Sequence, residues 1–97
     1  MLTGKQRSHL KGLANRADSI FQLGKNGLTE NFVKQIDEAL EAREIVKVNV
    51  LKNCSLDPTE VANTLVEQLS AEFVQSIGRK FVIYRESIEN KKIELPK

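Results

Sequence analysis

The sequence is poor in the residues that most enzymes and metal sites require. Its 97 residues include one cysteine, one histidine and no tryptophan. A single cysteine excludes a disulfide within the chain, and one cysteine with one histidine cannot form a Cys/His metal site. The nucleotide-binding motifs GxxxxGK[ST] and GxGxxG are also absent. We therefore expect a binding protein with no catalytic residues, no metal and no cofactor.

Long apolar stretches are missing as well. No run approaches the roughly 20 residues that cross a bilayer, and no apolar segment typical of a signal peptide follows Met1-Leu2-Thr3-Gly4-Lys5. With a free thiol, this predicts a cytoplasmic protein with no membrane partner. The composition, 40% hydrophobic and 29% charged, is typical of one globular domain, which we expect to be a monomer.

The spacing of apolar and turn residues predicts the order α-β-α-β-α-β-β. Helices are expected over residues 4–16, 29–43 and 58–70, and strands over 20–23, 45–51, 72–77 and 80–85. Two strand–helix–strand crossovers give the first three strands one direction, and a hairpin at Gly78-Arg79 adds an antiparallel strand. The fold class is therefore α/β, a two-layer α+β arrangement of a mixed four-stranded sheet with the second and third helices on one face.

We divide the chain into a single domain, residues 1–86, and a polar C-terminal tail, residues 87–97. The tail is expected to fray unless Ile88, Ile93 and Leu95 dock it. Several side chains have structural interpretations: Cys54 as a half-buried thiol, Phe81 and Tyr84 as core residues, and Asp37, Glu38 and Glu41 as solvated charges on a helix.

One tetrapeptide, Gly24-Lys25-Asn26-Gly27, connects the first strand to the second helix. Glycine lets backbone N–H groups approach an anion closely. The helix that follows directs its unpaired N–H groups and the positive end of its dipole at the same point. Lys25 adds a full positive charge. We interpret the segment as a loop that grips phosphate.

Charge is distributed unevenly along the chain. The net charge is +4 over residues 1–27, −5 over 28–76 and +3 over 77–97, for a total of +2. Strands of one direction end at one edge of the sheet, so the loops carrying Lys52 and Arg79 should lie beside the glycine loop. If the first helix runs antiparallel to the first strand, Lys5 returns to this edge too. The candidate binding residues are Lys5, Arg7, Lys11, Gly24, Lys25, Asn26, Gly27, Lys52, Arg79 and Lys80.

A basic edge opposite an acidic back, formed by the second and third helices, suits a polyanion ligand such as RNA. Two alternatives remain open from the residues alone. The acidic back could make the chain a protein-interaction module. The glycine loop could bind a small phosphate ligand, which would require a closed pocket there.

Three segments together carry a family resemblance: residues 2–11, beginning Leu2-Thr3-Gly4-Lys5-Gln6-Arg7; residues 22–30, around Gly24-Lys25-Asn26-Gly27; and residues 74–85, around Ile77-Gly78-Arg79-Lys80. The chain resembles, over about residues 1–85, a bacterial YhbY-like member of the CRM (chloroplast RNA splicing and ribosome maturation) domain family.

The resemblance implies a fold similar to the C-terminal domain of bacterial initiation factor three and a GxxG loop like that of KH domains. It implies RNA as the partner, in the form of large-subunit ribosomal RNA precursors, and a role in ribosome assembly. Gly24–Gly27 match the family's RNA-contacting loop, and the basic residues of the first helix match its positive surface. Arg79 and Arg85 fall in the closing motif, Arg79 as the expected contact and Arg85 as the expected structural residue.

Overall fold

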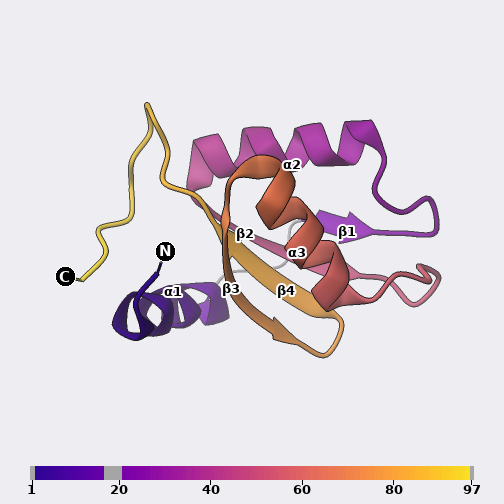
Figure 1. Ribbon diagram of the computed structural model, residues 1–97, viewed down its shortest axis with the longest axis horizontal. Coiled ribbons are helices and arrows are strands. Elements are labelled where there is room, and N and C mark those ends of the chain that lie inside the picture. Colours follow the sequence, from indigo (N-terminus) through magenta and orange to yellow (C-terminus); the bar gives the residue numbers. More distant parts are fainter. Residues whose placement is uncertain (1, 17–20, 97) are drawn as a thin grey trace.

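The computed structural model describes residues 2–16 and 21–96, which form three helices and a four-stranded sheet (Figure 1). The elements, in chain order, are α1 (Gly4–Arg16), β1 (Phe21–Leu23), α2 (Glu30–Arg43), β2 (Ile45–Val50), α3 (Pro58–Leu69), β3 (Glu72–Ile77) and β4 (Lys80–Tyr84). The predicted order and fold class are confirmed. Ile20, predicted to begin the first strand, lies outside the described residues.

Each helix begins at the capping residue that the sequence indicates. Thr3 Oγ1 accepts a hydrogen bond from the Gln6 backbone N–H at 3.1 Å, and the Gln6 side chain accepts one from the Thr3 N–H at 3.0 Å. This reciprocal pair is a capping box. Thr29 and Asp57 each accept from the backbone N–H three residues ahead, at 3.1 and 3.3 Å. The side chains at these positions satisfy N–H groups that the helices leave unpaired.

The strands are arranged in the order β1-β2-β4-β3. Strand β1 is parallel to β2, and β4 is antiparallel to both of its neighbours. Strands β1, β2 and β3 therefore share one direction, as predicted, and the last strand lies inside the sheet. The pairing of β3 with β4 shifts register between Phe73 and Gln75.

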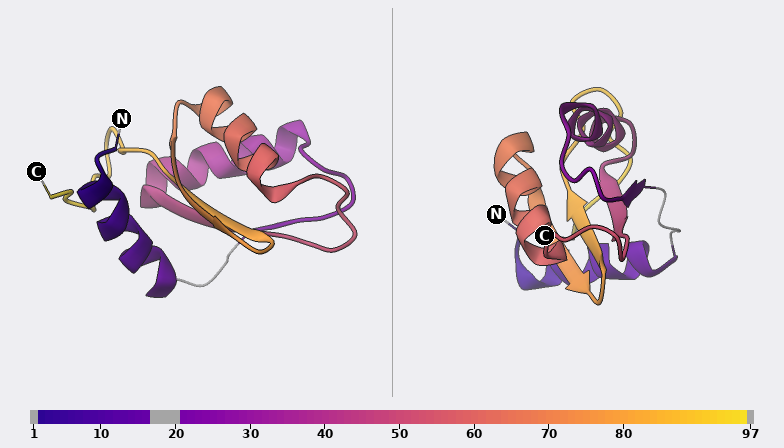
Figure 2. Two further views of the ribbon diagram at one scale, coloured as in Figure 1. Left: turned by 60° about the horizontal axis from the view of Figure 1, so that its bottom comes forward. Right: turned by 90° about the vertical axis from the view of Figure 1, so that its right-hand side faces the viewer.

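The sheet is covered on both faces, with α1 on one side and α2 and α3 on the other (Figure 2). Strand β4 contributes to both cores. Phe81 and Ile83 belong to the cluster under α2 and α3, whereas Val82 and Tyr84 belong to the cluster under α1. Cys54 is buried in the first cluster. Phe81 and Tyr84 are thus core residues, as expected, and Cys54 is a packed structural thiol.

The C-terminal tail is docked on the domain, which is the alternative to fraying that the sequence left open. Residues 87–96 contain no helix or strand, yet Ile93 and Leu95 pack against the α1 cluster. The Gln6 side chain also donates a hydrogen bond of 3.1 Å to the Pro96 carbonyl. Ile88 does not take part in this packing and is 90% exposed.

The carboxylate of Glu41, near the end of α2, holds the tail backbone. Glu41 accepts hydrogen bonds from the Ser87 hydroxyl at 2.6 Å and from the backbone N–H groups of residues 88 and 89 at 3.1 Å. These bonds, the one from Ser87 above all, lower the pKa of Glu41 from 4.5 to about 2. Asp37 forms an ion pair of 2.6 Å with Arg85. Asp37 and Glu38 are exposed, as expected for solvated charges, although Asp37 also pairs with Arg85. Glu41 is only half-exposed and is engaged with the tail.

Glu44, which ends α2, is completely buried. Burial raises the pKa of its carboxyl group, but hydrogen bonds from the backbone N–H groups of Ser87, Lys92 and Ile93 outweigh that effect, and the net pKa lies below its ordinary value. Its backbone has a φ of 68°, in the left-handed region that favours glycine. The hydrogen-bonded carboxylate gives a non-glycine residue a structural reason to occupy this position.

Candidate nucleic-acid interface

Three connections meet where β1 and β2 end: residues 24–29, residues 51–57 and the hairpin tip Gly78-Arg79, at the end of the molecule away from both termini (Figure 1). We call this the loop edge. The Leu51 N–H donates to the Leu23 carbonyl at 2.8 Å, and the Val50 N–H donates to the Arg79 carbonyl at 2.7 Å. The predicted meeting of these three connections is confirmed.

The glycine loop is a closed turn. The Gly27 N–H donates a hydrogen bond of 3.1 Å to the Gly24 carbonyl, which is the bond that closes a four-residue turn. The Gly27 amide is thereby used within the loop and does not face a ligand, contrary to the expectation for the whole tetrapeptide. Lys25 and Asn26 form the exposed tip, and their N–H groups are the ones that such a turn leaves out of its closing bond.

The two glycines of the loop have different roles. Gly27 has a φ of +67°, and a Cβ added there would lie 3.3 Å from Leu56 Cδ1. A side chain at Gly27 would therefore be both strained and crowded. A Cβ added at Gly24 would make ordinary contacts of 3.9 Å with Asn53 and Leu51. Gly27 is required by the turn geometry, whereas Gly24 brings the first loop against the second.

Two helices begin at the loop edge, and their N-termini differ in charge. The hydroxyl of Thr29 caps α2, and the carboxylate of Asp57 caps α3. An ionised carboxylate already offsets the positive end of the α3 dipole, so α2 has the N-terminus better suited to an external anion. Glu30 stands in the first turn of α2 and moderates this effect.

Arg79 holds the second loop in place. Its guanidinium donates hydrogen bonds to the carbonyls of Val50, Leu51 and Cys54 at 2.8, 3.0 and 3.2 Å. The side chain is half-buried, so its positive charge stays at the loop edge while its donors position the backbone. Arg85 likewise bonds the carbonyls of Leu69 and Asp37, at 3.1 and 2.9 Å, in agreement with the structural role expected for it.

The expectation that Lys5 returns to the loop edge is wrong. Helix α1 lies across β2 and β3 rather than along β1, because its apolar stripe packs against Val82 and Tyr84. Leu2, just before the helix, lies against Tyr84, the last residue of β4. The hairpin tip stands at the opposite end of that strand. Lys5 therefore lies at the far end of the sheet from the glycine loop.

The other candidate basic residues, Arg7, Lys11 and Lys80, line two grooves beside α1. Arg7 and Lys11 line a groove of about 480 Å³ beside the edge strand β3. Within the described chain, the Nε atom of Arg7 is buried with no hydrogen-bond partner. Lys80 lines a smaller groove near the end of α1, together with Asn15 and Lys47. The structure thus gathers Lys25, Asn26 and Lys52 with the Arg79 clamp at the loop edge, and separates these from the α1 residues.

Sequence reasoning missed the tail contacts of Glu41 and Glu44 and the clamp formed by Arg79. The partners in all three cases are mainly backbone groups, which leave no residue pattern to detect. A signal for the tail existed in Ile93 and Leu95, which are apolar residues within a polar segment.

The fold and the loop define a class: a small α+β domain with a GxxG turn between a strand and a helix N-terminus. Residues 2–85 match the CRS1 / YhbY (CRM) domain, and the chain belongs to this family.

The chain is 53% identical over 96 residues to a Bacillus subtilis protein named "Probable RNA-binding protein YqeI", covering 99% of this chain and all of that protein. It is 40% identical to a Haemophilus influenzae protein named "RNA-binding protein", over 99% of this chain and 96% of that one. The solution structure of SAV1595 from Staphylococcus aureus matches with a TM-score of 0.81 and 57% identity, covering 99% of this chain and all of that one. None of the helices within residues 2–16 and 21–96 is long and apolar enough to cross a membrane.

Proposed function

We propose that this protein binds RNA through the loop edge and that its target is precursor RNA of the large ribosomal subunit, whose assembly it assists. The observation that carries the proposal is the exposed tip Lys25-Asn26, presented by a closed turn at the N-terminus of α2. The names of the relatives support RNA as the ligand. The ribosomal target rests on the resemblance to YhbY-like proteins. On this proposal the protein is a cytoplasmic monomer that acts without catalysis.

Binding proceeds by contact with the RNA backbone. The amides of Lys25 and Asn26 and the start of α2 receive one phosphate, and the Lys25 and Lys52 side chains neutralise its neighbours. Arg79 fixes the Lys52 loop beside the glycine turn through its three carbonyl contacts. Because these are phosphate contacts, affinity falls steeply with salt, and selectivity comes from RNA shape.

The α1 groove supplies a second contact in this proposal. Arg7 and Lys11 face it, and their positive charges attract the RNA backbone. Lys80 extends the positive charge along the same side of the sheet. The exposed side chains at the loop edge form an open surface, which suits a polymer better than a small phosphate ligand.

The test compares two charge reversals that change net charge equally. Lys25→Glu alters the turn tip, whereas Lys34→Glu alters an exposed lysine of α2 that lines a groove between α2 and α3. Affinity for a large-subunit precursor RNA should fall about tenfold or more in Lys25→Glu, with a salt slope smaller by about one. Lys34→Glu should change affinity less than about threefold. Equal affinities of wild type and Lys25→Glu at physiological salt, with unchanged circular dichroism, would refute the proposal.

A further inference from the structure

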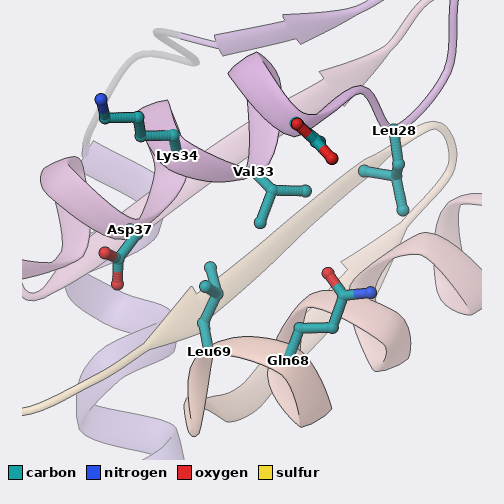
Figure 3. A pocket seen from close by; sticks show the side chains of 7 residues that line it. Leu28, Val33, Lys34, Asp37, Gln68 and Leu69 are labelled. Carbon is teal, nitrogen blue, oxygen red and sulfur yellow. The ribbon is translucent and has the colours of Figure 1, made fainter.

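A second groove lies on the opposite side of the sheet from α1, between α2 and α3 (Figure 3). Its volume is about 390 Å³, within the range of sites that accept ligand side chains. The half-buried side chains of Leu28, Val33 and Leu69 form its floor. Figure 3 shows these three side chains converging from the two helices and the segment before α2. The groove therefore leaves apolar surface open to a partner.

The rim of this groove is polar, with two acidic residues, one lysine and one glutamine. Glu30, Lys34 and Asp37 stand on α2, and Gln68 stands on α3. Asp37 keeps a half-exposed carboxylate although it pairs with Arg85. The two helices around the groove carry six carboxylates and two basic side chains. The field over this face is therefore negative and repels a nucleic-acid backbone.

We propose that the groove between α2 and α3 binds a Lys/Arg-rich segment of a protein partner, which places aliphatic side chains on Leu28, Val33 and Leu69. The cations of that segment face Glu30 and Asp37, and the Gln68 amide hydrogen-bonds its backbone. This combination of an apolar floor with a complementary charged rim is the arrangement by which grooves recognise amphipathic segments. The interaction is separate from RNA binding at the loop edge.

The occupant is assigned by charge and by shape. A phosphate polymer would meet the carboxylates of α2 and α3, and it would gain nothing from the aliphatic floor. A neutral apolar segment would use the floor but gain nothing from the negative field of the rim and of the two helices. A basic segment with spaced aliphatic residues satisfies both. Leu28 follows Gly27 directly, so such a partner would sit beside the RNA-contacting loop and could be held together with the RNA.

The experiment titrates the isotope-labelled full chain with a synthetic amphipathic peptide of lysine and leucine. Binding is followed through the backbone amide NMR signals of the protein. The largest shifts should fall on Leu28, Val33 and Leu69. Two control peptides isolate the contributions: serine in place of leucine removes the aliphatic contact, and glutamate in place of lysine reverses the charge. Both should bind at least about fivefold more weakly.

Matched variants locate the site. Glu30→Lys reverses a rim charge and should weaken the lysine–leucine peptide about fivefold. Glu67→Lys makes the same charge change on an exposed residue of α3 outside the groove lining, and its effect should stay under about twofold. Val33→Gln should weaken binding of the lysine–leucine peptide about fivefold, as Glu30→Lys does, while leaving RNA affinity unchanged. Circular dichroism and thermal melts verify that each variant is folded.

Four results would overturn the proposal. Equal losses in Glu30→Lys and Glu67→Lys would mean diffuse charge attraction. Equal binding of the serine control would mean that the floor is not used. Groove shifts with RNA, together with an RNA-binding defect in Lys34→Glu, would assign the groove to nucleic acid. Groove shifts that grow with protein concentration alone would assign it to a second copy of the chain.

Discussion

The guanidinium of Arg79, at the tip of the β3–β4 hairpin, donates a hydrogen bond of 3.2 Å to the carbonyl of Cys54, at the far end of the second loop. With its bonds to the carbonyls of Val50 and Leu51, this contact connects the last strand pair to the loop that carries Lys52. One side chain from a distant part of the sequence therefore helps to fix the backbone of the loop edge.

Replacing Arg79 should destabilise the protein. Arg79→Ala leaves three carbonyls without their donor, and we expect a loss of about 1–3 kcal/mol in the free energy of unfolding. Arg79→Lys should not restore it, because an ammonium group cannot reproduce the planar fork. Urea unfolding measures both, with the exposed neighbour substitution Lys80→Ala as the control. Equal stability of Arg79→Ala and Lys80→Ala would contradict the clamp.

The two loop glycines should respond differently to alanine. Gly27→Ala forces a side chain into a φ of +67° and against Leu56, and should cost about 1–2 kcal/mol of stability. Gly24→Ala meets only ordinary contacts and should change stability by less than about 0.5 kcal/mol. Thermal or urea unfolding of both variants decides the point. Similar costs at the two positions would show that the turn does not depend on the left-handed conformation of Gly27.

Charge reversal should reduce RNA affinity more at Lys52 than at Lys5. Lys52 is at the loop edge, and Lys5 is at the far end of the sheet, near Leu2 and Tyr84. Lys52→Glu should therefore weaken RNA binding several-fold more than Lys5→Glu. The slope of log affinity against log salt concentration should also be smaller by about one in Lys52→Glu. A salt-titrated binding assay with both variants measures the difference. A larger defect in Lys5→Glu would move the centre of the interface to the start of α1.

Acid should release the tail contacts of Glu41. The pKa of Glu41 is lowered to about 2 by the Ser87 hydroxyl and two tail amides. A carboxylate with a depressed pKa contributes stability above its ordinary pKa of 4.5, and this contribution is lost as the pH falls toward 2. Amide NMR signals of residues 88 and 89 should titrate with a midpoint near 2. Glu41→Gln should remove this titration, whereas a midpoint near 4.5 would show that the contacts do not form.

Removing the tail should destabilise the domain to which it is docked. In a chain that ends at residue 86, the Glu44 carboxylate loses its three backbone N–H donors. A carboxylate left without hydrogen-bond partners in the interior costs about 1–3 kcal/mol or more. The truncated chain should therefore melt at a lower temperature than the full chain. Adding Glu44→Gln to the truncated chain should recover part of the loss, because a neutral amide is less costly to bury. No change in melting on truncation would mean that residues 87–97 contribute no stability.

The sequence predicted the helices and strands closely because their signals are local. Capping residues such as Thr3 and Asp57 and the alternation in β2 act within a few residues. The direction of α1 could not be predicted in the same way. Its stripe of Leu10 and Ala14 shows that one face is buried, but not which strands it crosses, and the placement of Lys5 followed from that choice.

The other differences come from contacts between distant backbone and side-chain groups. Glu44 reaches tail amides 43 to 49 residues away, and Arg79 reaches carbonyls 25 to 29 residues away. A backbone N–H or carbonyl is present at nearly every position, so no residue type in the sequence indicates which one is the partner. The glycine loop was recognisable, whereas the closing bond that removes the Gly27 amide from the binding surface required the structure.

The position of β4 between β2 and β3 determines when this chain can fold during synthesis. Its side chains reach both cores, with Phe81 and Ile83 on one face and Val82 and Tyr84 on the other. A nascent chain that has not yet released residues 80–84 from the ribosome carries two apolar half-cores and an unpaired β3. We therefore expect the sheet to be completed only after the last strand has emerged, because β4 is the strand that joins β3 to β2.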